Sequence, residues 1–165
     1  LTAKAFDYIG RAQKALTPRA ALFGEYEFFR DRFAGIRRRN TVTGGVTLKA
    51  VNSARQTLAF DAGAGFISER KLTGVDVSSA SYLVGTGYAL KISETANLTD
   101  DFKLTGIVDD SSDYRVTHGV SITTRLAAGL SLKVSNLLRY AHQPPPGFKT
   151  LDSITSVAVV AKFAH

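Results

Sequence analysis

The feature that most constrains this chain is a two-residue alternation of apolar or small side chains with polar ones. Leu130 and Leu132, for example, alternate with Ser131 and Lys133. The pattern runs through residues 41–50, 57–66, 80–92, 114–123, 129–140 and 151–163. Because successive side chains of a β-strand point to opposite faces, each segment predicts a strand with one apolar and one polar face. No window of similar length favours the helical period of 3.6 residues, so the sequence predicts an all-β protein.

The length of these segments indicates the environment of the strands. They are about 10–14 residues long, whereas a usual strand has about 5–6 residues and a tilted strand crosses a membrane in about 9–11. No run reaches the roughly 18–20 consecutive apolar residues of a spanning helix, but spanning strands give only a weak hydropathy signal. We therefore expect an antiparallel up-and-down transmembrane β-barrel.

The connections between the segments are of two kinds, which alternate along the chain. Four are tight turns: Thr17-Pro18, Asn52-Ser53-Ala54, Glu94-Thr95-Ala96 and Ala127-Ala128-Gly129. Four are longer and more polar: Asp31 to Arg38, Lys71 to Val77, Asp109 to Asp113 and His142 to Lys149. Short turns at one end of a barrel and longer loops at the other are typical of outer-membrane barrels.

The number of strands has a consequence of its own. With a first strand at about 3–15, the chain holds nine strands, whereas single-chain bacterial barrels have an even number. We therefore expect ten or twelve strands in the intact chain, and residues 1–165 would be one barrel domain that lacks its N-terminal strand or strands. The chain contains no methionine, so we expect translation to start upstream of Leu1, and a signal peptide would account for a removed segment.

Charged residues fall on the polar face in mid-strand, where they would line the interior of a barrel. These lumen candidates are Glu25, Glu27, Lys49, Asp61, Lys91, Lys103, Arg115, Lys133 and Arg139. A water-soluble barrel would bury such charges at a cost of several kcal/mol each unless they were paired. A water-filled or ion-paired lumen accepts them readily. The charges therefore favour a membrane barrel over a soluble barrel that binds an apolar ligand.

The net charge is +7, and the densest basic patch flanks the first long loop. It consists of Arg30, Arg32, Arg37, Arg38 and Arg39. On an extracellular loop these guanidinium groups would be level with the phosphorylated sugars of lipopolysaccharide, with which they pair well. A solvated loop whose arginines pair with Asp31 explains the patch equally well. No recognition helix or stacking platform accompanies it, so nucleic acid is not expected as a partner.

Two motifs connect the chain to a family. Residues 25–36 read EYEFFRDRFAGI; residues 139–149 read RYAHQPPPGFK and are followed by DSIT at 152–155 and a last apolar strand. These motifs resemble the hallmark hairpin and the C-terminal hairpin of the YdiY-like family of salt-induced outer-membrane proteins. The resemblance implies a Gram-negative outer-membrane barrel with a signal peptide and of unknown function, with no catalytic residues to carry over. One departure is that Ala164 and His165 follow Phe163, although such proteins usually end on an aromatic residue.

The chain offers little for catalysis. It has no cysteine, which excludes disulfides, thiolate metal sites and cysteine nucleophiles. Its three histidines, His118, His142 and His165, lack metal-ligand spacing, and His118 falls on the apolar face. A membrane enzyme acting on lipid could combine His142 with Asp113 or Ser111, but such residues are also ordinary in polar loops. The glycine pairs in 63–65 and 85–87 lie inside strands, where we expect close packing or bending.

The sequence therefore predicts an integral outer-membrane β-barrel, non-enzymatic and without cofactor or metal, with a structural or narrow-pore, porin-like role in the Gram-negative envelope. A soluble barrel that binds a small apolar ligand and an outer-membrane enzyme acting on lipid are the alternatives. The expected partners are outer-membrane lipid and lipopolysaccharide, the barrel-assembly machinery during biogenesis, and further copies of the chain or other envelope proteins.

Overall fold

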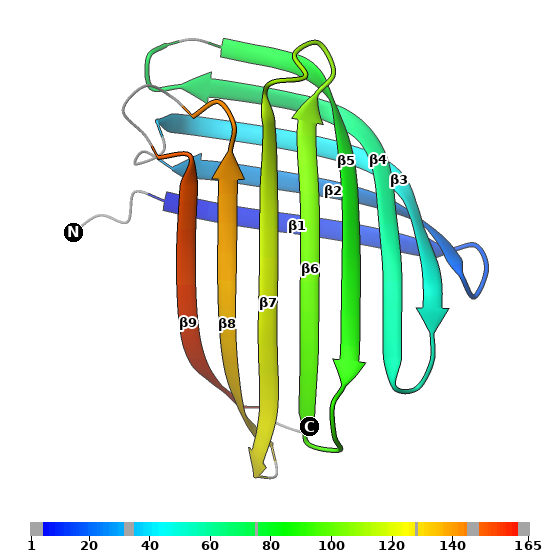
Figure 1. Ribbon diagram of the computed structural model, residues 1–165. Coiled ribbons are helices and arrows are strands. Elements are labelled where there is room, and N and C mark those ends of the chain that lie inside the picture. Colours follow the sequence, from blue (N-terminus) through cyan, green and yellow to red (C-terminus); the bar gives the residue numbers. More distant parts are fainter. Residues whose placement is uncertain (1–4, 32–34, 75, 128, 145–148, 162–165) are drawn as a thin grey trace.

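The computed structural model describes residues 5–31, 35–74, 76–127, 129–144 and 149–161 (Figure 1). The regular elements of these residues are nine strands: β1 (Ala5–Ala15), β2 (Ala20–Asp31), β3 (Ile36–Asn52), β4 (Gln56–Lys71), β5 (Asp76–Lys91), β6 (Ala96–Ile107), β7 (Tyr114–Ala127), β8 (Leu130–Ala141) and β9 (Leu151–Ala161). The prediction of an all-β fold is confirmed. The described part of the chain has no helix of the length and apolarity that crossing a membrane requires.

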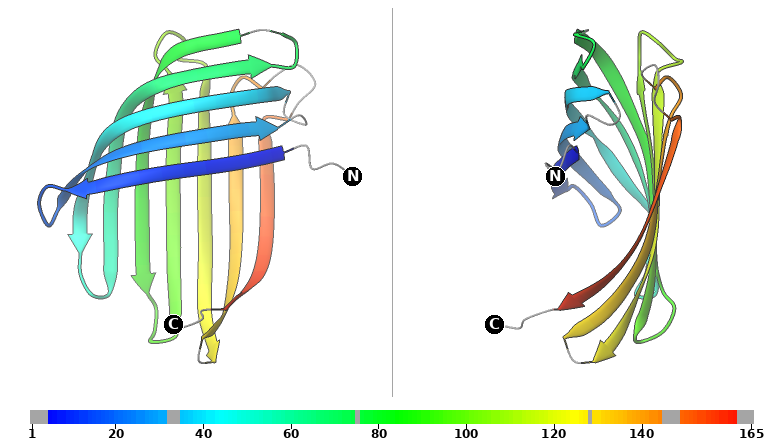
Figure 2. Two further views of the ribbon diagram at one scale, coloured as in Figure 1. Left: turned by 180° about the vertical axis from the view of Figure 1, so that it is seen from behind. Right: turned by 90° about the vertical axis from the view of Figure 1, so that its left-hand side faces the viewer.

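The strands form one antiparallel meander in which each pairs with its neighbours in sequence. The sheet curls so strongly that β1 and β2 run across the concave side of β6–β9, as the two views of Figure 2 show. Within the described residues, β1 and β9 are each paired along one edge only. The predicted up-and-down architecture is therefore confirmed as a curled half-barrel, and a total of ten or twelve strands stays a prediction.

The central strands are longer than the alternating segments predicted. β3, β4 and β5 have 17, 16 and 16 residues, because charged residues at their ends continue the ladder. Arg70 and Asp76, for instance, face each other across the β4–β5 hairpin and form an ion pair of 2.7 Å. The joints expected at Asp31–Arg38 and Lys71–Val77 shrink to residues 32–35 and 72–75, whereas 108–113 and 142–150 stay longer. Short and long connections thus alternate only in the second half of the chain.

Glycines permit the curl where β3, β4 and β5 bend. A Cβ atom on Gly65 would overlap the backbone carbonyl oxygen of Val42, and one on Gly45 would overlap the carbonyl oxygen of Ala62. Both glycines lie on the concave face, where a tight bend brings neighbouring strands and side chains close together. The expectation that the glycines in 63–65 are close-packing positions is confirmed. Outward-facing Gly44, by contrast, has open space around it.

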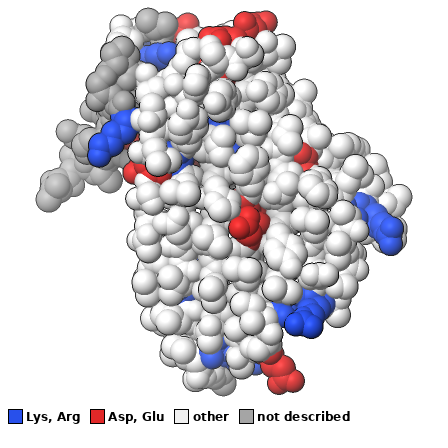
Figure 3. Space-filling view, in the orientation of Figure 1, with Lys and Arg blue, Asp and Glu red and all other residues white. Residues whose placement is uncertain are grey.

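The two faces of the sheet differ sharply in polarity. Large apolar side chains are exposed on the outward face, among them Tyr8, Val42, Phe66, Val84 and Val157. The concave side buries polar and charged residues, among them Glu25, Arg39, Thr43, Glu69 and Ser81. Figure 3 shows the outward face of β5–β9 almost free of charged atoms except at its margins and in one central patch. This arrangement inverts the usual one, in which apolar residues are inside and charges face water.

Candidate functional site

The candidate site is the space enclosed by the concave face, here called the lumen. A cavity of about 420 Å³ lies in it near the end that carries the longer connections. Its lining mixes apolar side chains such as Ile9, Phe29 and Leu137 with acids and bases from β1, β2, β3, β6, β7, β8 and β9. The charged groups of the lumen form three clusters and one further ion pair.

The central cluster joins β6 to β2. The ammonium group of Lys103 donates hydrogen bonds to carboxylate oxygens of Glu25 and Glu27, at 2.6 and 2.9 Å. Glu25 and Glu27 share the inward face of β2 because they are two residues apart. The side chain of Glu25 is only 8% exposed and those of Glu27 and Lys103 are 21% and 27% exposed. One cation thus bridges two carboxylates across the lumen, and we call this group the Lys103 clasp.

A second cluster is centred on Arg11 of β1, next to the Lys103 clasp. Its guanidinium group lies 3.2 Å from Glu25 and 2.8 Å from Asp61 of β4, and it also donates to the hydroxyl oxygen of Thr47 at 3.0 Å. The same group lies over the ring of Phe23, 3.9 Å from its centroid. Glu25 is therefore shared between Lys103 and Arg11, so the two clusters form one continuous network.

The third cluster lies nearer the long connections, where Glu69 of β4 is shared by two arginines. Arg39 of β3 lies 2.6 Å from its carboxylate and Arg115 of β7 lies 3.2 Å from it. Arg115 also approaches Asp113 at 3.6 Å. Arg39 Nη2 and Glu69 Oε1 are buried and have no hydrogen-bond partner among the described residues. Removing Glu69 would therefore leave two guanidinium groups without their common carboxylate.

A further ion pair ties the open edge of the half-barrel to its far side. Arg139 of β8 donates to Asp7 of β1 at 2.8 Å, across 132 positions of sequence. The ring of Phe29 lies 5.7 Å from the guanidinium carbon of Arg139 and 5.4 Å from that of Arg39, which is within the range of cation–π attraction. The lumen near the longer connections thus presents charges of both signs, held in pairs.

The predicted lumen charges share one face. Pairing register places Glu25, Glu27, Lys49, Asp61, Lys91, Lys103, Arg115, Lys133 and Arg139 on the concave side. The clusters above unite most of them. Lys49, Lys91 and Lys133, towards the tight-turn end, have no ion-pair partner among the described residues.

Asp7, Arg11 and Glu69 complete these clusters but were not among the residues predicted from the sequence. Asp7 and Arg11 alternate with Phe6 and Tyr8, so extending the period-two pattern to β1 would have found them. Glu69 lies an even number of residues from Asp61 on β4 and therefore faces inward too, but the predicted alternating segment ends at residue 66. Its partnership with Arg39 across β3 and β4 follows from their register.

The predicted lipopolysaccharide patch is only partly as expected. Arg30, Arg37 and Arg38 are exposed near the long-connection end, and Arg32 lies outside the described residues. Arg39 does not belong to the patch, because it is 6% exposed and points into the lumen. The reason is that β3 begins at Ile36, so Arg39 is a strand residue. It is two positions from Thr41 and therefore faces inward as Thr41 does. The exposed basic surface therefore consists of Arg30, Arg37 and Arg38.

Among the described residues, His142 contacts aromatic side chains at the rim and forms no hydrogen bond with Asp113 or Ser111. His142 stacks on Tyr114 at a centroid distance of 4.9 Å and its Nδ1 lies 3.0 Å from the hydroxyl oxygen of Tyr140. Asp113 instead approaches Arg115. His118 faces outward beside Asp100, and His165 lies outside the described residues. Within the part of the chain that is described, no three acids or histidines are grouped to hold a metal ion.

The two longer connections are tied to each other at the rim. Gln143 donates to the hydroxyl oxygen of Ser112 at 2.5 Å, and the backbone N–H of His142 donates to the carbonyl oxygen of Tyr114. Within 108–113, the hydroxyl and backbone N–H of Ser112 both donate to Asp110, and these bonds lower the pKa of that carboxyl group. The rim is thus organised by hydrogen bonds rather than by a cluster of reactive groups.

Fold and lumen together define a class: an antiparallel meander, curled into a half-barrel, with an apolar outward face and an ion-paired interior. The model of a family described as protein of unknown function, DUF481, matches residues 1–163. The chain belongs to this family, with which the YdiY-like resemblance of its two motifs is consistent. No curated protein and no solved structure matches the chain.

Proposed function

We propose that this protein is an integral outer-membrane β-barrel without enzymatic activity, whose lumen is largely filled by its own ion pairs and which serves as a structural element or a narrow pore. The observation that carries the proposal is the inverted polarity of the sheet. Its outward face exposes Tyr8, Val42 and Phe66, while its concave face buries Glu25 and Arg39.

The polarity of the two faces favours a lipid environment around the outward face of the sheet. Exposed apolar side chains spread over all nine described strands would favour leaving water, at about 25 cal/mol per Å² of apolar area covered. The strands are 11 to 17 residues long, which exceeds the roughly 9–11 residues that a tilted strand needs to cross the hydrocarbon. In a barrel, lipid covers the outward face, and the inward charges stay in contact with water or with one another.

The ion pairs support a narrow passage rather than a wide one. Lys103 reaches from β6 to Glu25 and Glu27 on β2, and Arg139 reaches from β8 to Asp7 on β1. Such contacts across the interior leave limited room, in keeping with the cavity of about 420 Å³. Because both signs of charge line the path, the pore would discriminate little between small anions and cations.

Closure of the half-barrel and contact with the membrane surface belong to the same proposal. The free edges of β1 and β9 would be covered by further strands, for a total of ten or twelve, because a spanning sheet cannot leave backbone groups unpaired in lipid. Arg30, Arg37 and Arg38 would contact the phosphate groups of lipopolysaccharide, and the barrel-assembly machinery would insert the chain. A soluble barrel for an apolar ligand gains no support, because it would need an apolar interior.

The experiment is a fractionation followed by electrophoresis with and without boiling. We expect the protein in the detergent-extracted membrane fraction and a different mobility for the unboiled sample, because a closed membrane barrel resists detergent until it is heated. Planar-bilayer recordings then separate a structural barrel, with no conductance, from a narrow pore with small unitary currents. A protein that stays in the aqueous fraction and shows no heat-dependent shift would refute the membrane proposal.

A further inference from the structure

Five polar side chains lie in two adjacent rows across the outward face of β6–β9, at about the middle of the strands. Strand register aligns Asp100, Val120, Asn136 and Thr155 in one row, and Phe102, His118, Leu138 and Ser153 in the next row towards the long connections. We call the polar members of the two rows the outward stripe: Asp100, His118, Asn136, Ser153 and Thr155. The stripe ends at β9, whose outer edge has no partner strand among the described residues.

The stripe is organised by hydrogen bonds between neighbouring strands. Nε2 of His118 lies 3.2 and 3.1 Å from the two carboxylate oxygens of Asp100. The amide of Asn136 donates to Thr155 at 2.9 Å and to Ser153 at 3.3 Å. Each cluster keeps capacity for further bonds. The side chains of His118 and Asp100 are still 37% and 40% exposed, and Nδ1 of His118 makes no hydrogen bond within the described residues.

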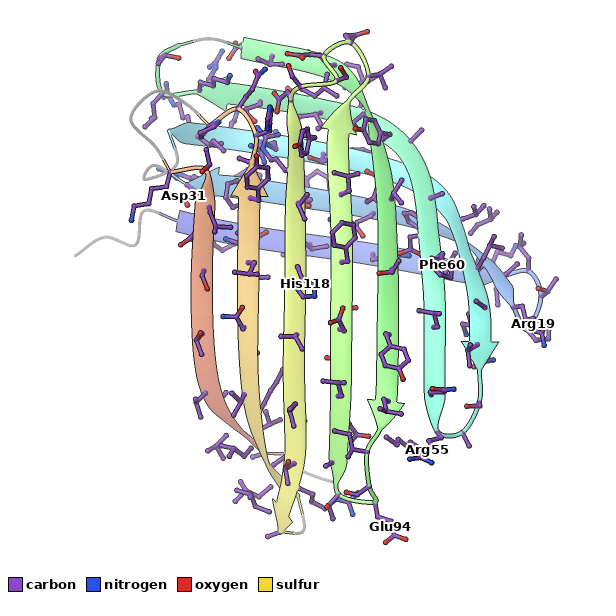
Figure 4. All side chains as sticks on the ribbon, viewed as in Figure 1. Arg19, Asp31, Arg55, Phe60, Glu94 and His118 are labelled. Carbon is purple, nitrogen blue, oxygen red and sulfur yellow. The ribbon has the colours of Figure 1, made fainter. Side chains whose placement is uncertain are left out.

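The stripe is out of place on a surface that faces hydrocarbon. Other charged residues of the outward face, such as Lys14, Arg30 and Arg70, lie near strand ends. Figure 3 shows a prominent acidic patch in the middle of a mostly uncharged face, and Figure 4 places His118 at the same height. Lipid offers no hydrogen-bond partners, and intramembrane ionisable groups usually face a protein partner or a water-filled space. The position of the stripe therefore indicates a covered surface.

We propose that the outward stripe is the contact surface between two copies of this chain. This inference rests on the proposed membrane function. Two barrels in one membrane are related by a twofold axis along the membrane normal, which keeps every residue at its own height. A mid-height stripe therefore meets the stripe of the second copy. Its chemistry is self-complementary, because the carboxylate of Asp100 and the amide oxygen of Asn136 can accept, while the hydroxyl groups of Ser153 and Thr155, which accept from Asn136, can still donate.

The shape of this part of the sheet agrees with such a contact. In the edge-on view of Figure 2, β6–β9 form one bowed layer, whereas β1–β4 and the upper part of β5 turn away. Apolar residues surround the stripe, including Phe102, Ile122 and Val134, each at least 36% exposed. The second copy would thus meet a polar centre with an apolar border, and lipid would cover the remaining outward surface.

Cysteine cross-linking tests the contact directly, because the chain has no cysteine of its own. Val120→Cys places a thiol in the stripe between Asp100 and Asn136, and Val46→Cys places one on the outward face of β3 as a matched control. After oxidation in native membranes, we expect at least fivefold more disulfide-linked dimer from Val120→Cys than from Val46→Cys. Equal yields from the two variants, or cross-links of Val120→Cys to other proteins only, would overturn the proposal.

A second measurement removes the polar groups. A triple variant with Asp100→Leu, His118→Leu and Asn136→Leu should insert well into lipid and should change from twice the mass of one chain to the mass of one chain in detergent. Asn40→Leu, which removes an outward amide bonded to Tyr26 on β2, should keep the doubled mass. A heat-shifted, membrane-extracted wild type at the mass of one chain would refute the contact alone. An aqueous protein without a heat shift would refute the membrane function as well.

Discussion

Replacement of Lys103 by methionine tests whether the lumen is held together by its ion pairs. Lys103→Met keeps the unbranched apolar stem of the side chain and removes the ammonium group that Glu25 and Glu27 share at 2.6 and 2.9 Å. Two carboxylates on the same face of β2 would then lose their common cation. Removing one partner of a buried ion pair costs about 3–5 kcal/mol, because the remaining charge is left uncompensated.

The expected loss is smaller than this range for two structural reasons. The side chain of Lys103 is 27% exposed, so water can replace part of the interaction. Glu25 also keeps Arg11, at 3.2 Å. We therefore expect the free energy of unfolding to fall by about 2–3 kcal/mol, which is close to the contribution of one or two hydrogen bonds to a charged group. This corresponds to a change of about 30- to 150-fold in the unfolding equilibrium constant.

The assay is urea unfolding of the protein folded into short-chain lipid vesicles, with the folded fraction read from the unboiled electrophoretic band. Lys91→Met is the matched control, because Lys91 also faces inward but forms no ion pair within the described residues; its effect should stay within about 0.5 kcal/mol. Adding Glu27→Gln to Lys103→Met should recover part of the loss. If Lys103→Met and Lys91→Met unfold at the same urea concentration, the clasp does not stabilise the barrel and the reasoning is refuted.

Three further changes have defined outcomes. Glu69→Gln should cost about 3–4 kcal/mol in the same assay, more than Arg39→Gln, because it leaves both Arg39 and Arg115 without their carboxylate; the reverse order would contradict the shared pair. Gly65→Val should cost at least about 1–3 kcal/mol because its side chain meets the backbone of Val42 and Thr43, whereas Gly44→Val, in open space, should be nearly neutral. Exchanging Arg30, Arg37 and Arg38 for glutamine should reduce binding to lipopolysaccharide vesicles at low salt without changing stability, and unchanged binding would reject their assignment.

The strands and their faces could be predicted from the sequence because both follow from a local rule. The side-chain period of two is set by the backbone within each strand, so Leu130 and Ser131 reveal their faces without reference to any other part of the chain. The alternation is harder to recognise in β6, because Asp100 interrupts the apolar face of that strand. The contact of Asp100 with His118 was therefore not predicted.

The partnerships of the lumen charges could not be predicted, because they depend on the curl of the whole sheet. Lys103 and Glu25 are 78 positions apart and on strands that are not neighbours. Their contact requires the bend at β3–β5, where Gly65 lets a strand approach the backbone of Val42. Parity predicts that each charge faces inward, but not which opposite charge it meets. Arg39 shows the opposite error. Its place in a run of arginines beside a long loop suggested an exposed residue, but β3 begins at Ile36 and Arg39 faces inward.

The inverted polarity explains why averages over this sequence are uninformative. Its mean hydropathy is −0.01, because apolar outward residues and polar inward residues alternate one by one and cancel. A soluble protein with the same average would collect its apolar residues inside, and its charges would rarely be buried. Here Glu25 and Glu69 are buried, and Val42 and Val157 are exposed at 57% and 68%. The direction in which the sheet curls therefore decides which of the two alternating sets of side chains faces outward. Closing the sheet with its glycine-lined bend inward makes the polar set the interior, and this places ion pairs where a water-soluble barrel would place its core.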